Sequence, residues 1–222
     1  TSVTVNSNVK IGGDGGENGE EESEGGTAFR VSGYGDITGF LLNNGTIEGS
    51  TGILIASDTF DGDIINTGII GGDYYGIAIE SLFVGDVEDS STINNSGTIS
   101  GNVAVFIGAS TDSYFGSKFA GTITNTGSIV GDVTGLEISL ISFEGDIING
   151  VGGLISGGVT GAYIETETFE GDIVNNGVIK GFDNDTGLHV VTTGTHTGDI
   201  VNNGTLNAPG NALHVEIETM LG

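Results

Sequence analysis

The chain has 222 residues, of which 30 are acidic and 4 are Lys or Arg, so its formal net charge is −26. A surface this acidic repels phosphate groups, which excludes nucleic acid as a partner and argues against binding to an anionic membrane. The absence of cysteine excludes a disulfide framework and thiol chemistry. The 43 glycines stand beside a single proline, so they are expected to mark turns of a folded chain rather than a disordered linker.

Residues 1–11 are predicted to form a short strand, since Val3, Val5, Val9 and Ile11 alternate with polar residues. The stretch 12–30 is rich in glycine and glutamate and is expected to be an acidic loop or linker. From residue 31 to 222 no further boundary is visible. The chain starts without methionine, shows no signal peptide and has no apolar run long enough to cross a membrane, so we expect a processed, exported form.

A repeat organises residues 31–222. One half of its unit is Gly-Asp-Ile-x-Asn, found at residues 62–66, 145–149, 171–175 and 198–202. The other half is Asn-x-Gly-x-Ile-x-Gly, whose central glycine recurs at positions 45, 68, 97, 127, 153, 177 and 204, in steps of 23 to 30 residues. Short apolar segments with two-residue alternation are separated by turn-forming residues. The pattern predicts an all-β fold, a parallel β-helix (β-solenoid) of about seven coils with three short strands each.

Stacked coils align equivalent side chains at a spacing of about 4.8 Å, so two rows are expected. An aromatic residue precedes the Gly-Asp-Ile strand by two positions, which predicts a row of Phe60, Phe83, Phe119, Phe143, Phe169 and, in the last unit, His196. Asparagines near positions 43, 66, 95, 125, 176 and 203 are expected to pass amide hydrogen bonds from coil to coil. Both rows are interpreted as structural.

The best carboxylate cluster comprises Glu144, Asp146, Glu170 and Asp172. Each pair is spaced i, i+2 on one strand face, and the two pairs lie 26 residues, one coil, apart. Stacked carboxylates repel by roughly 1 kcal/mol near a surface unless a cation intervenes, and oxygen ligands select Ca²⁺. These four residues are therefore a candidate calcium site, and the alternative is a solvated acidic stripe screened by salt.

His189 and His214 occupy equivalent outward positions 25 residues apart and are expected to be neighbours on adjacent coils. Two imidazoles can share a zinc or copper ion, although a repeated pair of surface histidines is the simpler explanation. No Ser-His-Asp or Cys-His pattern stands out, and the basic residues that assist polysaccharide cleavage are scarce. We therefore expect no enzymatic activity and no cofactor other than calcium.

Residues 84–119 depart from the regular repeat, with extra length before Asn95 and at 110–117. Loops inserted at one corner of a solenoid often carry binding specificity. The alternative is a bulge without a role.

The two half-units resemble those of bacterial surface β-helix proteins: autotransporter passengers, filamentous-haemagglutinin-like adhesins and related extracellular fibres. The resemblance covers about residues 31–222. It implies a right-handed solenoid outside the cell that adheres or assembles. It carries over no binding-site residue, because the same coil serves adhesins, fibres, lyases and tailspikes.

Both ends of the predicted stack offer unpaired strand edges, and Leu213, Val215 and Ile217 still alternate as a strand near the C-terminus. We therefore expect a structural protein at the cell surface that joins head to tail with itself. Residues 1–11 are expected either to pair with a neighbouring subunit or to cap their own first coil. The alternatives are a monomeric adhesin or passenger segment that binds a glycan or cell surface through residues 84–119, and a polysaccharide-degrading enzyme or tailspike.

Overall fold

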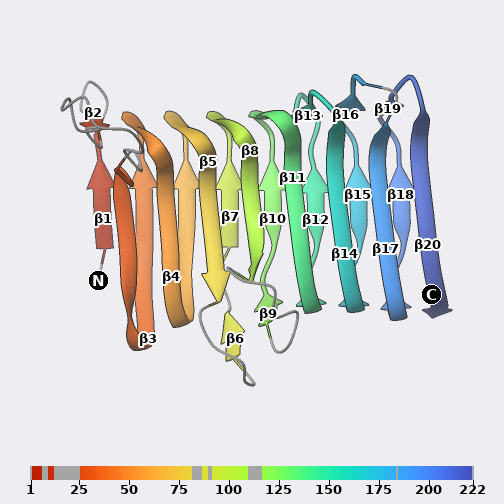
Figure 1. Cartoon of the computed structure of the whole chain (residues 1–222), viewed down its shortest axis with the longest axis horizontal. Helices are drawn as coiled ribbons and strands as arrows, with labels where there is room; N and C mark the ends of the chain where they lie inside the picture. Colours follow the sequence, from red (N-terminus) through yellow and green to blue (C-terminus); the bar gives the residue numbers. More distant parts are fainter. Residues whose placement is uncertain are drawn as a thin grey trace, which may run out of the picture.

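A computed structural model describes residues 2–6, 10–12, 26–81, 87–89, 92–109, 117–183 and 185–221. Over these residues the chain forms twenty β-strands and no helix. All strands belong to one sheet that coils around the long axis of the molecule (Figure 1). The pairings are parallel, and each joins a strand to its counterpart one turn away. The predicted all-β parallel solenoid is confirmed.

The strands form three series by register. The first series contains β1 (Ser2–Val5), the ends of β3 (Phe29–Asn43) and β4 (Thr46–Asn66), β7 (Thr92–Asn95), β10 (Ile123–Asn125), β12 (Ile147–Asn149), β15 (Ile173–Asn175) and β18 (Ile200–Asn202). The second contains β2 (Lys10–Gly12), the starts of β4, β5 (Ile69–Ser81), β8 (Thr98–Ala109) and β11 (Ser128–Glu144), then β13 (Leu154–Gly157), β16 (Val178–Gly181) and β19 (Thr205–Asn207). The third contains the rest of β3, β4, β5, β8 and β11, then β14 (Thr160–Glu170), β17 (Thr186–Thr197) and β20 (Asn211–Leu221), with β6 (Val87–Asp89) and β9 (Ser117–Ala120) beside it.

The coil count is slightly lower than predicted. Six register steps lead along the first series from Asn43 to Asn202. The units from Asn43 to Asn202 therefore span about six turns, slightly fewer than the seven coils predicted.

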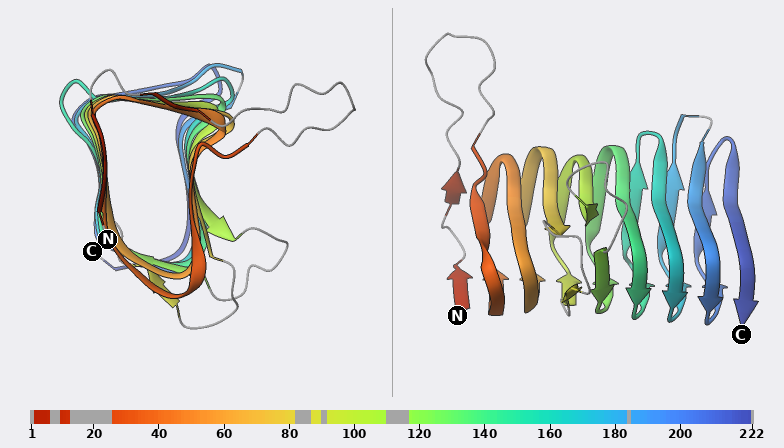
Figure 2. Two further views of the ribbon diagram at one scale, coloured as in Figure 1. Left: turned by 90° about the vertical axis from the view of Figure 1, so that its left-hand side faces the viewer. Right: turned by 60° about the horizontal axis from the view of Figure 1, so that its bottom comes forward.

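The third strand of each coil is longer than expected. β17 runs for 12 residues and bends at a register shift between Thr192 and Thr195. It thereby covers two sides of the outline, which is roughly four-sided when the coils are viewed end-on (Figure 2). Other shifts lie at Gly49/Thr51 and Gly131/Thr134. The corners thus absorb the differences in repeat length while the straight segments stay in register.

The core consists of isoleucine-rich rows that run along the axis. Ile64, Ile70, Ile77 and Ile79 of one turn are almost completely buried, and so are their register partners in the neighbouring turns. Burying one such side chain contributes about 1.5–3 kcal/mol. Since the inward residues of each coil contact those of the coils on either side, the core is continuous although the coil is narrow.

The asparagine row lies inside the solenoid. Each side-chain amide donates to the carbonyl oxygen of the next asparagine at 2.7–2.9 Å. The row contains Asn43, Asn66, Asn95, Asn125, Asn149, Asn175 and Asn202. The predicted members Asn176 and Asn203 are wrong by one residue. They lie outside the core, where Asn203 Nδ2 donates to Asn176 Oδ1 at 3.1 Å.

The aromatic row is confirmed from Phe119 to His196 and is internal there. The rings of Phe119, Phe143, Phe169 and His196 stack with centroids 5.3, 5.0 and 4.7 Å apart. Phe83 lies outside the described residues, and the β6 residue in register with Phe119 is Asp89. Only the backbone of Phe60 is described, in register with Ile37.

The central glycine of the repeat is required by close backbone approach. A Cβ added at Gly127 would collide with the carbonyl oxygen of Gly97, and one added at Gly97 would collide with that of Gly68. The glycine before the aspartate of the Gly-Asp-Ile motif is required for a different reason, since Gly171 has a φ of +139°, a backbone conformation that residues with a Cβ rarely adopt.

Both strands of the N-terminal segment lie on the first coil of their own chain. β1 pairs with β3, with Val5 opposite Asn43, and β2 pairs with β4, with Ile11 opposite Ile47. β3 begins at Phe29, two residues before the predicted start of the solenoid. Most of the acidic stretch 12–30 lies outside the described residues, so its predicted role as a linker stays a prediction.

We expect Asn125→Ala to destabilise the fold by roughly 2–3 kcal/mol. Asn125 accepts from Asn95 at 2.8 Å and donates to Asn149 at 2.9 Å, so alanine leaves buried amide groups without partners. The control is Asn176→Ala, which removes an exposed hydrogen bond. Urea denaturation monitored by circular dichroism gives both values, and equal losses in the two variants would show that the internal row contributes nothing special.

The imidazole of His196 predicts a pH dependence of stability. It is completely buried and neither ring nitrogen has a hydrogen-bond partner. Burial lowers the pKa of His196, and the Asp172 carboxylate offsets this only in part. The unfolded chain therefore takes up a proton more readily near its pKa of about 6.5, so stability is full above that pH and falls as the pH drops below it.

His196→Phe is expected to continue the phenylalanine row and to reduce this acid loss. The measurement is the difference between the urea midpoints at about pH 8 and about pH 5.5. The variant should keep a part of the acid-induced loss of stability, because burial also lowers the pKa of His189. An unchanged difference in the variant would contradict the assignment to His196.

Candidate functional site

The four predicted calcium ligands lie on adjacent coils. Glu144 at the end of β11 is in register with Glu170 at the end of β14, and both are exposed. Asp146 and Asp172 follow in the turns before β12 and β15. The expected stacking of the two pairs is therefore seen, while binding of Ca²⁺ by this acidic quartet stays a prediction.

The two aspartates of the quartet have a structural task. Oδ1 of Asp146 accepts a hydrogen bond from the backbone N–H of Asp172 at 2.9 Å. Oδ1 of Asp172 in turn accepts from the N–H of Asp199 at 2.9 Å. These bonds link one coil to the next at the left-handed glycine turn, which explains the aspartate of the Gly-Asp-Ile motif without a ligand. One oxygen of each aspartate is thereby engaged.

The insertion at 84–119 is described only in part. β6 pairs with β9, so that Val87 is opposite Ser117 and Glu88 is opposite Lys118. This short pair lies at the lower edge of the stack in Figure 1. The segment at 110–116, which accounts for much of the extra length, lies outside the described residues, and its predicted role in binding stays a prediction.

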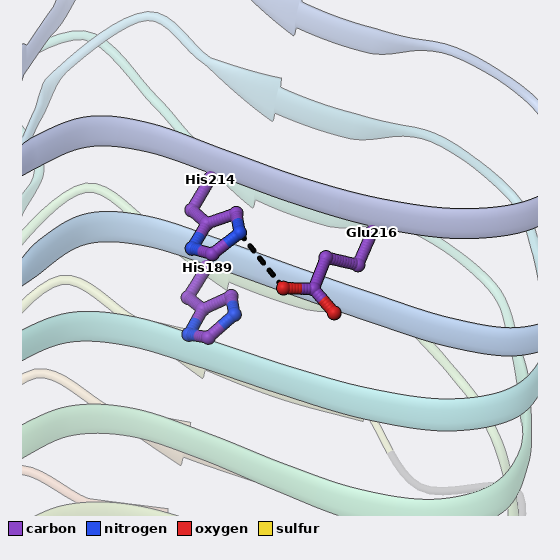
Figure 3. A group of neighbouring side chains, drawn as sticks. All are labelled: His189, His214 and Glu216. Carbon is purple, nitrogen blue, oxygen red and sulfur yellow. Dashed lines mark ion pairs between the residues drawn. The ribbon is translucent and has the colours of Figure 1, made fainter.

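A histidine–glutamate cluster lies on the outer surface of the last two coils. His189 on β17 is in register with His214 on β20, as expected, and their rings stack with centroids 4.5 Å apart and planes 5° apart. Glu216 lies two residues after His214 on the same strand face, and its Oε1 is 2.9 Å from His214 Nε2. Figure 3 shows the parallel rings with Glu216 reaching across to His214.

The surroundings of His189 favour the neutral form of its imidazole. Burial lowers the pKa of His189, and the nearby imidazole of His214 lowers it further. The carboxylates of Glu216, Asp185 and Glu165 act in the opposite direction without reversing the shift. Its Nε2 is shielded from solvent and has no hydrogen-bond partner.

Glu216 was not among the predicted site residues. The signal available was its i+2 spacing from His214, which places both side chains on one strand face. Among the described residues, His189, His214 and Glu216 form the group in which one ligand atom of each residue lies within 4.8 Å of the others.

The coil at the C-terminal end exposes side chains at positions that are interior elsewhere. Leu188 on β17 is 2% exposed, whereas Leu213, its register partner on β20, is 45% exposed. His196 is fully buried, whereas its partner Met220 is 51% exposed. The difference arises because β17 is covered by β20, whereas no described strand pairs with the other edge of β20. This end face, defined by Leu206, Leu213, Val215 and Met220, is apolar.

Comparison with protein-family models, with curated proteins and with solved structures gave no match. The resemblance to bacterial surface β-helix proteins therefore rests on the repeat alone. Within the described part of the chain, no helix has the length and apolar character needed to cross a membrane.

Glu170→Gln is expected to raise the free energy of unfolding by about 0.3–1 kcal/mol at low salt without calcium, because it removes a like charge opposite Glu144. The gain should shrink as salt screens the pair. The control is Glu167→Gln, an exposed glutamate on the same strand with no acidic register partner.

The same two variants test the calcium prediction. Calcium at about 10 mM should then stabilise the wild type more than Glu170→Gln, because the variant lacks one ligand. Equal responses of the wild type and both variants, measured by thermal unfolding, would contradict a calcium site at the quartet.

Proposed function

We propose that the chain is a non-enzymatic, extracellular structural module that joins head to tail into a filament. The observation that carries the proposal is the apolar end face of β19 and β20. Its four side chains lie in register with buried residues of the preceding coil. Covering such rows with another coil removes apolar surface from water at about 25 cal/mol per Å².

The partner that fits this face is a coil with the same outline, and a second copy of the chain supplies one. The coils superimpose end-on, and β1 begins at the corner where β20 ends (Figure 2). The first coil of a second copy can therefore continue the parallel pairing without a change of cross-section. Because such a contact uses two different surfaces and does not close, it extends into a linear polymer.

Charge supports a second copy as the partner. The first coil carries two of the four basic residues, Lys10 and Arg30, while the last coil carries Asp199, Glu216 and Glu218. The outer row that begins at Arg30 ends at His214, two residues from Glu216. In-register stacking thus brings the Arg30 position beside a carboxylate, and such complementarity favours one orientation of the contact.

The asparagine row does not cross the proposed junction. Val5 takes the position opposite Asn43 in the first coil, so a docked copy offers no amide to Asn202. The junction depends instead on backbone pairing and on apolar rows. This makes it weaker than the contact between two coils of one chain, and self-association is expected to depend on concentration.

The extracellular assignment is supported by composition. A net charge of −26 with 4 basic residues keeps a rod soluble and apart from anionic surfaces. The absence of cysteine leaves the stack independent of redox conditions. The non-enzymatic assignment is supported by the structural roles that the described asparagine, aspartate and phenylalanine rows already have.

Leu213→Lys is expected to weaken self-association at least about tenfold, because it places a charge in the apolar end face. The control is Val151→Lys, which makes the same change of charge at a position that is 84% exposed on the side of the stack. Sedimentation over a range of concentrations and electron microscopy give the size and shape of the assemblies. Unbranched thin fibres that form with the control and not with Leu213→Lys are the expected result.

A monomer at every concentration, with and without calcium, would overturn the proposal. So would association that Val151→Lys and Leu213→Lys reduce equally, because the contact would then not involve the end face.

A further inference from the structure

We propose that His189, His214 and Glu216 bind a divalent transition-metal ion, best matched by Zn²⁺. This site lies on the outer surface and does not require the proposed assembly, although His214 and Glu216 are on β20, the strand on which a second copy would dock. Its three residues come from two adjacent coils, β17 and β20. A bound ion would therefore fasten the last coil to the one before it.

The backbone fixes the arrangement of the three ligands. Parallel pairing places His189 directly opposite His214, and strand alternation places Glu216 on the same face as His214. Ligand atoms of the three residues lie within 4.8 Å of one another. Two ligands on one tetrahedral zinc ion are about 3.3 Å apart, since zinc–nitrogen bonds are about 2.0 Å long. Coordination would therefore require side-chain rotation that turns the edges of the two rings toward Glu216.

The chemistry of the donors selects the metal. Imidazole nitrogen and carboxylate oxygen are ligands of zinc, whereas Ca²⁺ and Mg²⁺ take oxygen ligands. Two histidines and one glutamate leave one coordination position for water. The side chains of His214 and Glu216 are 38% and 61% exposed, so an ion can reach them from solvent.

Further features of the surroundings favour a cation at this site. The shielded Nε2 of His189 has no hydrogen-bond partner, so it keeps a donor atom without a task in the fold. A carboxylate group on each neighbouring strand, Glu165 on β14 and Glu216 on β20, adds negative charge, as does Asp185 before β17. The Tyr163 ring packs edge-on against His189 at 5.2 Å and closes the side away from His214.

Neutral imidazole is the form that binds metal. Burial lowers the pKa of His189 and thereby favours this form. Protons compete with the ion, so metal affinity is expected to fall as the medium is acidified.

The test uses the full chain, freed of metal by a chelator and titrated with Zn²⁺ by calorimetry at a concentration below that of self-association. We expect one ion per chain. His189→Ala and His214→Ala should each weaken binding at least about tenfold, and Glu216→Gln should weaken it by about tenfold. Glu218→Gln, which makes the same change of charge on the same strand, should bind like the wild type.

Two readouts separate a true site from non-specific attraction to an acidic protein. Co²⁺ should give the visible absorption of a tetrahedral nitrogen and oxygen site in the wild type and in Glu218→Gln, and this absorption should be lost in His189→Ala. Zn²⁺ should also raise the thermal midpoint of the wild type and leave that of the His189→Ala/His214→Ala double variant unchanged.

Binding that the double variant retains would overturn the proposal, as would the absence of binding at zinc concentrations up to about 0.1 mM. Either result would make the two rings a stacked pair with a purely structural role. Neither would bear on assembly, which is tested by Leu213→Lys at the end face.

Discussion

The parallel pairing of every strand with its counterpart one turn away is the interaction on which the rest of the structure depends. It places each residue beside the residue in the same position of the next repeat, so a side chain that suits one coil must suit its own copy at about 4.8 Å. Isoleucine, asparagine and phenylalanine meet this condition in different ways. Isoleucine packs on isoleucine, the asparagine amide both donates and accepts, and phenylalanine rings stack face to face.

The same parallel pairing explains where stacked side chains repel one another or lack a hydrogen-bond partner. Aspartate and glutamate cannot stack on themselves without repulsion. The aspartates of the Gly-Asp-Ile motif avoid it by accepting a backbone N–H from the next coil, whereas Glu144 and Glu170 face each other in solvent. Histidine lies between these cases, because its ring can stack while its nitrogens are polar. In the core, His196 closes the phenylalanine row at the cost of two unpaired nitrogens, and on the surface the His189 and His214 rings stack with Glu216 beside them.

The repeat was sufficient to predict the fold, the asparagine row, the aromatic row from Phe119 to His196 and the contact between His189 and His214, because equivalent positions become neighbours in a solenoid. The errors have physical causes. The doublets Asn175-Asn176 and Asn202-Asn203 each offer two candidates, and a shift of one residue moves a side chain from the core to the surface. Ile173 was the available guide, since it shares the inward face with Asn175. Glu216 escaped notice because the preceding coil has Val191 at the same position, so the neighbouring repeat does not mark it. The long third strand escaped notice because a bulge hides its continuity.

The stacking of coils has a consequence for how the length of the molecule can change. Since each coil contacts only its two neighbours, duplication of one unit adds a turn without disturbing any existing contact. Each added turn lengthens the rod by about 4.8 Å and leaves its width the same. The number of units therefore determines the length of the rod. Evolution can change that length by the gain or loss of repeats, without a change of fold.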